Sequence, residues 1–226
     1  MSKKRTEPTS KEIYKRTIEL IEKEKVILLA SSKSHKSLLE ASKYAEENGF
    51  SLFGIDYKVP GIKDMLKTLK RQGQRNLGVF SISTRKEARI AINAGALFIF
   101  STHVDKGIIR RCNEESVFHA IGALTPTEVF NTYDLGANAV SLFPCEKMGG
   151  LSWFMFLREI FPKVKFVPTD KMSPYEASQY LNAGAYAVAP IIDLERIKDP
   201  KELIREFSVT QGRDDRRVVS TNDTAI

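Results

Sequence analysis

Eight short apolar runs, each followed by an amphipathic segment, are the feature that most constrains the fold of this chain. The runs are continuous rather than alternating, which is typical of parallel strands buried on both faces. They cover residues 26–30, 50–56, 77–80, 96–101, 117–122, 139–142, 164–168 and 186–189. Strict alternation of strand and helix predicts a parallel sheet. Because eight is the number of such units that closes a barrel, we predict a (β/α)8 barrel.

Helix signals fill the segments between the runs. Helices are predicted at residues 11–24, 35–47, 61–71, 85–93, 104–112, 151–158 and 194–207, with two more beginning at 125 and 173. Ser10 is a predicted cap of the first helix, which we expect to lie under the barrel floor, and Thr84 opens a capping box. Gly95, Gly136 and Gly184 follow helix ends, where glycine readily adopts the left-handed conformation.

The length of 226 residues suits a single barrel domain. We predict a loose N-terminus at residues 1–10, the barrel at residues 11–209 and a flexible polar tail at residues 210–226. The net charge is +7, but the basic residues are interleaved with acidic ones, as in residues 19–25. This pattern favours a solvated surface over a nucleic-acid site.

The two cysteines, Cys112 and Cys145, have no paired spacing, which favours a reducing compartment. The N-terminus has no apolar signal-peptide core, and no continuous apolar run reaches the length of a membrane span. We therefore predict a cytoplasmic protein without a membrane contact.

Four motifs occur in order along the chain and carry a resemblance to a known family. Residues 94–101 (AGALFIFS), 121–128 (IGALTPTE), 139–150 (AVSLFPCEKMGG) and 166–174 (FVPTDKMSP) resemble motifs of the class I 2-keto-3-deoxy-6-phosphogluconate and 4-hydroxy-2-oxoglutarate (KDPG/KHG) aldolases. The third, for example, resembles Lys-x-Phe-Pro-Ala-Glu-x-x-Gly-Gly. The resemblance covers roughly residues 12–195. It implies an aldolase-type TIM barrel, a homotrimer, no cofactor, and cleavage of a keto acid to pyruvate and an aldehyde.

The functional positions of that family are occupied by different residues here. The resemblance places the lysine that forms a Schiff base at Ser141 and the acid/base glutamate at Gly54. It places an arginine that helps to hold the substrate carboxylate at Lys58, and two Gly-Gly pairs that hold phosphate at residues 170–171 and 189–190. Serine has no amine and cannot form an imine. We therefore predict a degenerate, inactive or altered active site.

Chemistry in barrels of this kind lies where the strands end and the following loops begin. Residues at these positions are expected to line a pocket that takes a small keto acid or sugar acid. They are Asp56, Lys58, Ser81, Ser101, His103, Gly122, Ser141, Phe143, Thr169, Asp170 and Lys171. No His, Asp or Glu cluster has the spacing of metal ligands, so no metal site is predicted.

Three classes of function remain open from the sequence. They are an aldolase-family lyase with an altered site, a non-catalytic oligomeric binding or scaffold protein, and an enzyme of different chemistry at the same mouth of the barrel, the end where the strands finish. A relocated Schiff-base lysine at Lys58, Lys147 or Lys171 would support the first.

A different chemistry would need other groups at the mouth. His103 with Asp56 and Asp170 is a candidate metal or acid/base set for the third class. His119 lies within a predicted strand and is expected to be a core or interface residue. The aromatic residues of 153–156 are expected to pack on the barrel or on a neighbouring subunit.

Overall fold

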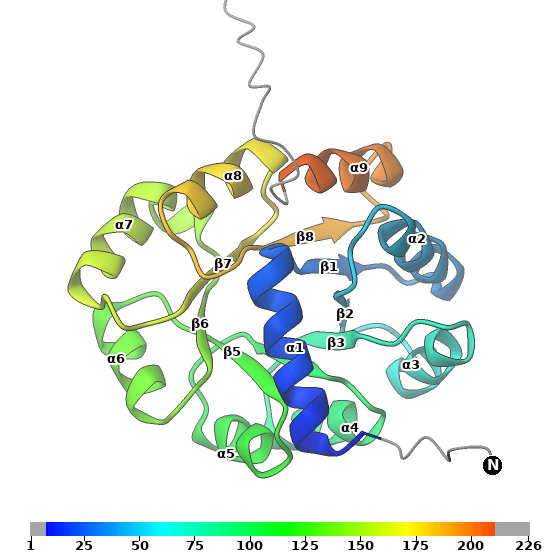
Figure 1. The fold of residues 1–226 in the computed structure, drawn as a ribbon, viewed down its shortest axis with the longest axis horizontal. Helices are drawn as coiled ribbons and strands as arrows, with labels where there is room; N and C mark the ends of the chain where they lie inside the picture. Colours follow the sequence, from blue (N-terminus) through cyan, green and yellow to red (C-terminus); the bar gives the residue numbers. More distant parts are fainter. Residues whose placement is uncertain (1–7, 211–226) are drawn as a thin grey trace, which may run out of the picture.

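A computed structural model describes residues 8–210 and confirms the predicted (β/α)8 barrel (Figure 1). Eight parallel strands follow one another around the barrel in chain order, and β8 pairs with β1 to close it. The strands are β1 (Leu28–Ser31), β2 (Phe53–Asp56), β3 (Leu77–Ile82), β4 (Phe98–Ser101), β5 (Phe118–Gly122), β6 (Ala139–Leu142), β7 (Phe166–Asp170) and β8 (Ala189–Asp193). Their carboxyl ends form one face of the barrel, which we call the mouth.

Helices surround the strands, and one further helix covers the opposite face. They are α1 (Ser10–Glu24), α2 (His35–Glu47), α3 (Ile62–Arg71), α4 (Arg85–Asn93), α5 (Lys106–Glu114), α6 (Pro126–Asp134), α7 (Gly150–Ile160), α8 (Pro174–Asn182) and α9 (Pro200–Thr210), with a short 3₁₀ helix η1 (Glu146–Met148) before α7. Among those in the described range, no helix combines the length and apolar character needed to cross a bilayer.

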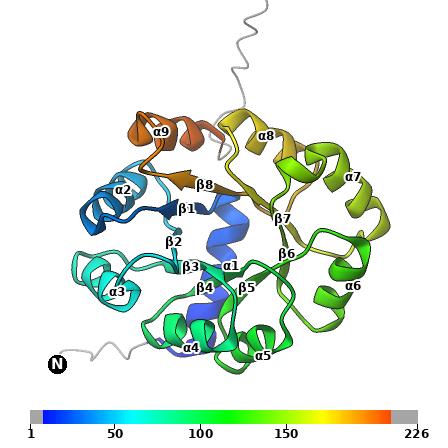
Figure 2. The ribbon, with the colours of Figure 1, turned by 180° about the vertical axis from the view of Figure 1, so that it is seen from behind.

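The first helix closes the barrel floor, as predicted. Figure 1 shows α1 lying across the strands in front, and Figure 2 shows the mouth with α1 behind it. The cap is Thr9 rather than Ser10, because the Thr9 hydroxyl accepts from the Glu12 amide while the Glu12 carboxylate accepts from the Thr9 amide. Ser10 is the first helical residue, so the predicted loose N-terminus is wrong at this point. Residues 1–7 and 211–226, including most of the predicted tail, lie outside the described range.

The end of the barrel differs from the prediction. The predicted strand 186–189 overlaps β8 only at Ala189, because β8 begins there, runs through Pro190 to Asp193 and pairs with β1 at Leu29–Ile191 and Ser31–Asp193. Residues 189–190 therefore lie inside β8 and not in a loop after it. The predicted helix 194–207 is also wrong at its start, because Asp199 caps α9 and Pro200 occupies its first position.

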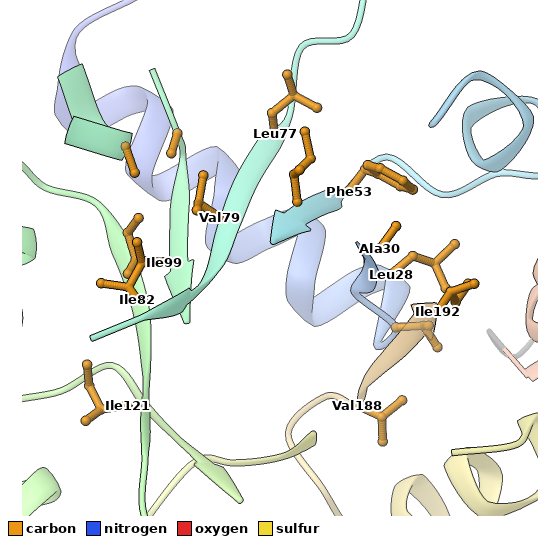
Figure 3. Close-up of a cluster of buried hydrophobic side chains, with 14 of the residues drawn as sticks. Leu28, Ala30, Phe53, Leu77, Val79, Ile82, Ile99, Ile121, Val188 and Ile192 are labelled. Carbon is orange, nitrogen blue, oxygen red and sulfur yellow. The ribbon is translucent and has the colours of Figure 1, made fainter. Parts of the chain in front are cut away.

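The core has two layers. The outer layer lies between the strands and the helices, and Figure 3 shows part of it, with Leu28, Phe53, Val79 and Ile99 on neighbouring strands. The inner layer fills the barrel itself. It contains four aromatic rings from β3, β4 and β5, which are Phe80, Phe98, Phe100 and Phe118. Residues of α1 seal the inner layer at the barrel floor. The predicted left-handed glycines are confirmed at Gly95, Gly136 and Gly184, with φ of 91°, 80° and 89°.

Candidate functional site at the barrel mouth

The space on the barrel axis is almost completely filled at the mouth. A cavity of about 20 Å³ remains there, and residues from five of the strands and the loops after them line it. Its lining consists of Phe80, Ser81, Phe100, Ser101, Thr102, Ser141, Phe143, Thr169 and Ile191. A cavity needs roughly 10–15 Å³ to hold one water molecule. The axial cavity therefore has room for a single water and not for an organic acid.

An aromatic ring explains why the barrel has so little space below this cavity. Phe98 is fully buried, and its ring lies over two glycines on neighbouring strands. A Cβ atom at Gly78 would stand 2.0 Å from Phe98 Cε2, and one at Gly54 would stand 2.4 Å from Leu29 Cδ2 and 3.3 Å from the Phe98 ring. Real Cβ contacts are never that short. The position aligned with the family's glutamate is thus occupied by the side chains of its neighbours.

Ser141 lines the axial cavity, and its hydroxyl is hydrogen-bonded within the protein. It is 1% exposed, and its Oγ donates to Thr169 Oγ1 at 2.9 Å. Thr169 in turn donates to the carbonyl of Val167 at 2.9 Å. A serine hydroxyl acts as a nucleophile only when a base takes its proton. The partner here is another hydroxyl, so this pair supports packing and not catalysis.

Ser101 and Gly122 position a loop across the mouth. Ser101 Oγ donates to the carbonyl of His103 at 2.9 Å and accepts from the amide of Gly122 at 3.2 Å. A Cβ at Gly122 would stand 2.4 Å from the backbone carbon of Thr102, so only glycine lets this loop pass. Ser81 lies at an irregularity of β3 and has φ of 61°, a conformation that costs energy for serine.

A larger pocket lies off the axis, at the rim between the carboxyl ends of β1, β2 and β8. Its volume is about 310 Å³, at the lower end of the range for small-molecule sites. We call it the rim pocket, and it is lined by Ser31, Ser32, Lys33, Asp56, Lys58, Val59, Asp193, Glu195 and Arg196. Asp56 and Lys58 are the predicted site residues that lie here.

The carboxylates of the rim pocket are already engaged with the protein. Asp193 pairs with Lys171 at 3.1 Å and with Arg196 at 3.5 Å. Partial burial acts to raise the pKa of Asp193, but the hydrogen bond and charge of Lys171, together with the Glu195 amide and the charge of Arg196, lower the pKa overall. Asp56 accepts from the backbone amide of Lys58 at 3.0 Å.

The third acid of the rim pocket, Glu195, is bonded to the loop that follows β1. Glu195 accepts from the backbone amide of Lys33 and from the Ser32 hydroxyl. In contrast, the ammonium groups of Lys33 and Lys58 form no ion pair with any residue in the range 8–210. The rim pocket therefore offers two exposed cations and several hydrogen-bonding groups to a small anion.

Four predicted site residues line neither cavity; they are His103, Gly122, Asp170 and Lys171. His103 is exposed, and its Nδ1 lies 3.1 Å from Thr102 Oγ1. Asp170 turns toward η1, where it accepts from the amides of Glu146 at 3.0 Å and Lys171 at 2.8 Å. Within residues 8–210 no group of three His, Cys, Asp or Glu side chains could hold a metal ion. The structure thus does not bring His103, Asp56 and Asp170 together as a metal centre.

Seven of the nine residues that line the rim pocket were not predicted, all except Asp56 and Lys58. Lys33 follows β1 and was not singled out as a site residue, whereas Asp193, Glu195 and Arg196 were missed because strand eight was predicted to end before Pro190. A usable signal was present, since Ile191-Ile192-Asp193 resembles the end of β2, where Ile55 precedes Asp56. Both acids stand at the carboxyl end of a strand and at the same edge of the barrel.

The fold and the position of these cavities define a closed (β/α)8 barrel with its candidate site at the carboxyl ends of the strands, where enzymes of this architecture bind their substrates. The family model of KDPG and KHG aldolase matches residues 17–198, so the chain belongs to that family.

Individual relatives are distant. A 2-dehydro-3-deoxy-phosphogluconate aldolase of Treponema pallidum is 28% identical over 46% of this chain, and the match spans only 50% of that relative's length. A crystal structure of a 4-hydroxy-2-oxoglutarate/2-dehydro-3-deoxyphosphogluconate aldolase from TTHB1 superposes with a TM-score of 0.75 and 25% identity, covering 86% of this chain and 98% of that one. A KDPG aldolase from Legionella pneumophila, with pyruvate captured as a covalent carbinolamine, gives a TM-score of 0.73 at 16% identity over 86% of this chain and 96% of its own.

Proposed function

We propose that this protein is a KDPG/KHG aldolase-family member that binds a small keto acid or sugar acid without cleaving it through an imine. The observation that carries the proposal is the axial cavity of about 20 Å³, which holds Ser141 where the family's lysine is expected. A covalent nucleophile typically contributes on the order of a million-fold in rate. Its loss, together with the lack of space on the axis, leaves the aldol cleavage without a reactive group or a substrate position.

In this proposal the rim pocket is the binding site. A carboxylate or phosphate group lies between the ammonium groups of Lys33 and Lys58, which have no counter-ion among residues 8–210. Hydroxyl groups of the ligand donate to Asp56, whose carboxylate has accepting capacity beyond its bond to the Lys58 amide. The pocket therefore favours a compact hydroxylated or oxo acid over a neutral or cationic molecule.

Borohydride reduction in the presence of pyruvate tests the catalytic half of the proposal. Reduction traps any imine as a permanent mass increase, which intact mass spectrometry and peptide mapping locate. We expect no increase here and a full increase in the Legionella relative, which captures pyruvate covalently. An increase mapped to Lys58, Lys147 or Lys171 would overturn the proposal and make the protein an aldolase with a relocated lysine.

Calorimetric titration with pyruvate and with 6-phosphogluconate tests the binding half. We expect Lys33→Gln and Lys58→Gln each to weaken binding by about two- to fivefold, as the loss of one exposed charged contact does. Lys36→Gln is the matched control, because Lys36 is 86% exposed on α2 and pairs with Glu40 instead of facing the pocket. Equal losses in all three variants would indicate a general charge effect and no site.

We also propose that the protein assembles as a homotrimer through an apolar face on α6, η1 and α7. This face contains the exposed side chains Phe130, Tyr133, Met148, Met155, Phe156 and Ile160. Trp153 stacks on Phe156 at 5.2 Å between ring centroids and donates to the carbonyl of Leu124, so the aromatic pair is fixed in place. Aromatic and methionine side chains are the residues that protein interfaces favour.

Sedimentation velocity tests the assembly. We expect the wild type to sediment as a trimer and Phe156→Lys to shift it toward monomer. Tyr175→Lys serves as the control, since Tyr175 is 71% exposed on α8 and lies outside the apolar face. A monomeric wild type, or equal dissociation of both variants, would contradict the assignment.

A cytoplasmic location is part of the same proposal. Cys112 and Cys145 are both buried and free, which fits a compartment that keeps thiols reduced. Fractionation of the source cells, with the protein recovered outside the cytosolic fraction, would refute it.

A further inference from the structure

A groove on the barrel floor, on the face opposite the mouth, gathers cations that no part of the proposed function uses. Its volume is about 560 Å³, and its lining comes from the first turns of α1, the end of α3 and the segments that lead into β3 and β4. We call it the floor groove. Its lining is Pro8, Glu12, Ile13, Arg16, Thr17, Lys70, Arg75, Asn76 and Leu97.

The three cations of the floor groove have no carboxylate partner in the described part of the chain. Arg16, Lys70 and Arg75 are absent from every ion pair formed among residues 8–210. The single acid in the lining, Glu12, is committed to the capping box of α1, where it accepts from the Thr9 amide at 2.7 Å. That backbone hydrogen bond, assisted by the Thr9 hydroxyl, lowers the pKa of Glu12, so it remains charged and engaged.

Lys70 shows that the groove is more than a stretch of fully solvated side chains. Its Nζ lies over Gly95, only 1.7 Å from where a Cβ atom of that residue would stand. Because Gly95 has no side chain, the ammonium group of Lys70 can occupy the space where a Cβ atom would stand. Partial burial lowers the pKa of Lys70, because neighbouring groups replace part of its water and supply no negative charge. An anion in the groove would stabilise the charged form of this lysine.

The ligand class follows from the number of charges and the shape of the groove. Three cations without partners suit an anion with several negative charges at short spacing, and Arg binds phosphate oxygens in a bidentate manner. Pro8, Ile13 and Leu97 add an apolar part to the lining.

We propose that the floor groove binds a compact oligophosphate, held by Arg16, Lys70 and Arg75. The ligand source is inorganic tripolyphosphate or the triphosphate group of a nucleotide, since both present the same anion. This site is independent of the rim pocket, because the two lie on opposite faces of the barrel and share no residue.

Isothermal titration of the full-length protein with tripolyphosphate and, separately, with ATP tests the site at low ionic strength. We expect one equivalent of tripolyphosphate to bind, and Arg16→Gln and Arg75→Gln each to weaken its binding by about two- to fivefold. Lys67→Gln is the matched control, because Lys67 lies on α3 one turn before Lys70 but pairs with Asp64. Tighter binding of ATP with the same dependence on Arg16 and Arg75 also supports the proposal and identifies a nucleotide as the source.

Three results would overturn the proposed oligophosphate site. One is the absence of tripolyphosphate binding by the wild type, and another is an equal loss of affinity in Lys67→Gln. The third is binding of a long RNA without any binding of tripolyphosphate or ATP, which would indicate a polyelectrolyte surface. Because all three variants change exposed side chains, circular dichroism is expected to show unchanged folding.

Discussion

Replacement of Gly78 by alanine tests whether the Phe98 ring closes the barrel interior. The new methyl group would stand 2.0 Å from Phe98 Cε2 and 2.1 Å from Cδ2. Phe98 is fully buried and also covers Gly54, so its ring cannot move toward solvent to make room. The backbone of Gly78 is not left-handed, and the conflict is therefore one of packing alone.

The magnitude follows from two opposing terms. Overpacking of a dense core costs about 1–3 kcal/mol, while alanine in place of glycine within a strand recovers roughly 0.5–1 kcal/mol of chain entropy. We expect a net loss of about 1–2 kcal/mol for Gly78→Ala. Phe98→Leu alone should cost about 1–2 kcal/mol, less than the 3–5 kcal/mol of a truncation to alanine. In the double variant the conflict is relieved, which predicts a favourable coupling of about 1 kcal/mol.

Urea unfolding of the four proteins in this cycle measures the coupling. Gly107→Ala is the control, because a Cβ atom at Gly107 in α5 would stand 3.1 Å from Oδ1 of the capping Asp105 and 3.3 Å from Arg85 Cβ, a much milder conflict than at Gly78. Alanine there also gains helix propensity, so the control should lose less stability than Gly78→Ala. Unchanged stability of Gly78→Ala, or additive losses in the double variant, would refute the packing of Phe98 described here.

Three further predictions follow from buried polar groups. Burial lowers the pKa of His119 despite hydrogen bonds to backbone carbonyls, so the unfolded chain binds the His119 proton more tightly than the folded one does. The free energy of unfolding should therefore fall as pH drops below 6.5, by at most about 1.4 kcal/mol per pH unit. Urea unfolding at several pH values should show a flatter pH profile for His119→Gln. Tyr14→Phe removes the acceptor of Asn138 Nδ2 and should cost about 1 kcal/mol, whereas Asn138→Ala should cost about 2–3 kcal/mol in the same assay because the His119 amide also loses its partner. Burial raises the pKa of Cys112 and of Cys145 to about 12, so a thiol reagent should label them only at the rate of unfolding, and rapid labelling of the native protein would contradict this.

The number and order of the elements could be predicted because few other folds are compatible with continuous apolar runs separated by helical segments. The errors lie at element ends, where two local signals compete. The predicted strand 186–189 ended before Pro190, yet the apolar residues after this proline pair with β1. At α9, an Asp199-Pro200 start signal competed with a longer helical pattern. At α1, Thr9 and Ser10 can both cap, and only the position of Glu12 selects Thr9.

The residues at the mouth could be predicted as a group because parallel strands end at one edge of a sheet. Their orientation could not. Asp170 ends β7, but the amide of Glu146 draws its carboxylate toward η1 and away from the axis. Likewise, no local pattern indicates that the Phe98 ring covers Gly54 and Gly78 on the two preceding strands. Such contacts depend on the combined volumes of side chains that are distant in the sequence.

The structure separates two requirements that an imine-forming aldolase must meet at one place. The position of Ser141 is buried, and an amine there would have the lowered pKa that attack on a carbonyl requires. However, the rings of Phe80 and Phe100 leave only about 20 Å³ beside it, so a keto acid could not reach that amine. The rim pocket has the opposite properties, since its 310 Å³ admit a small acid but Lys33 and Lys58 are exposed to solvent. An exposed ammonium binds an anion without becoming a nucleophile. Space and a buried position for an amine thus lie in different parts of the mouth, which is the argument for the proposed binding without turnover.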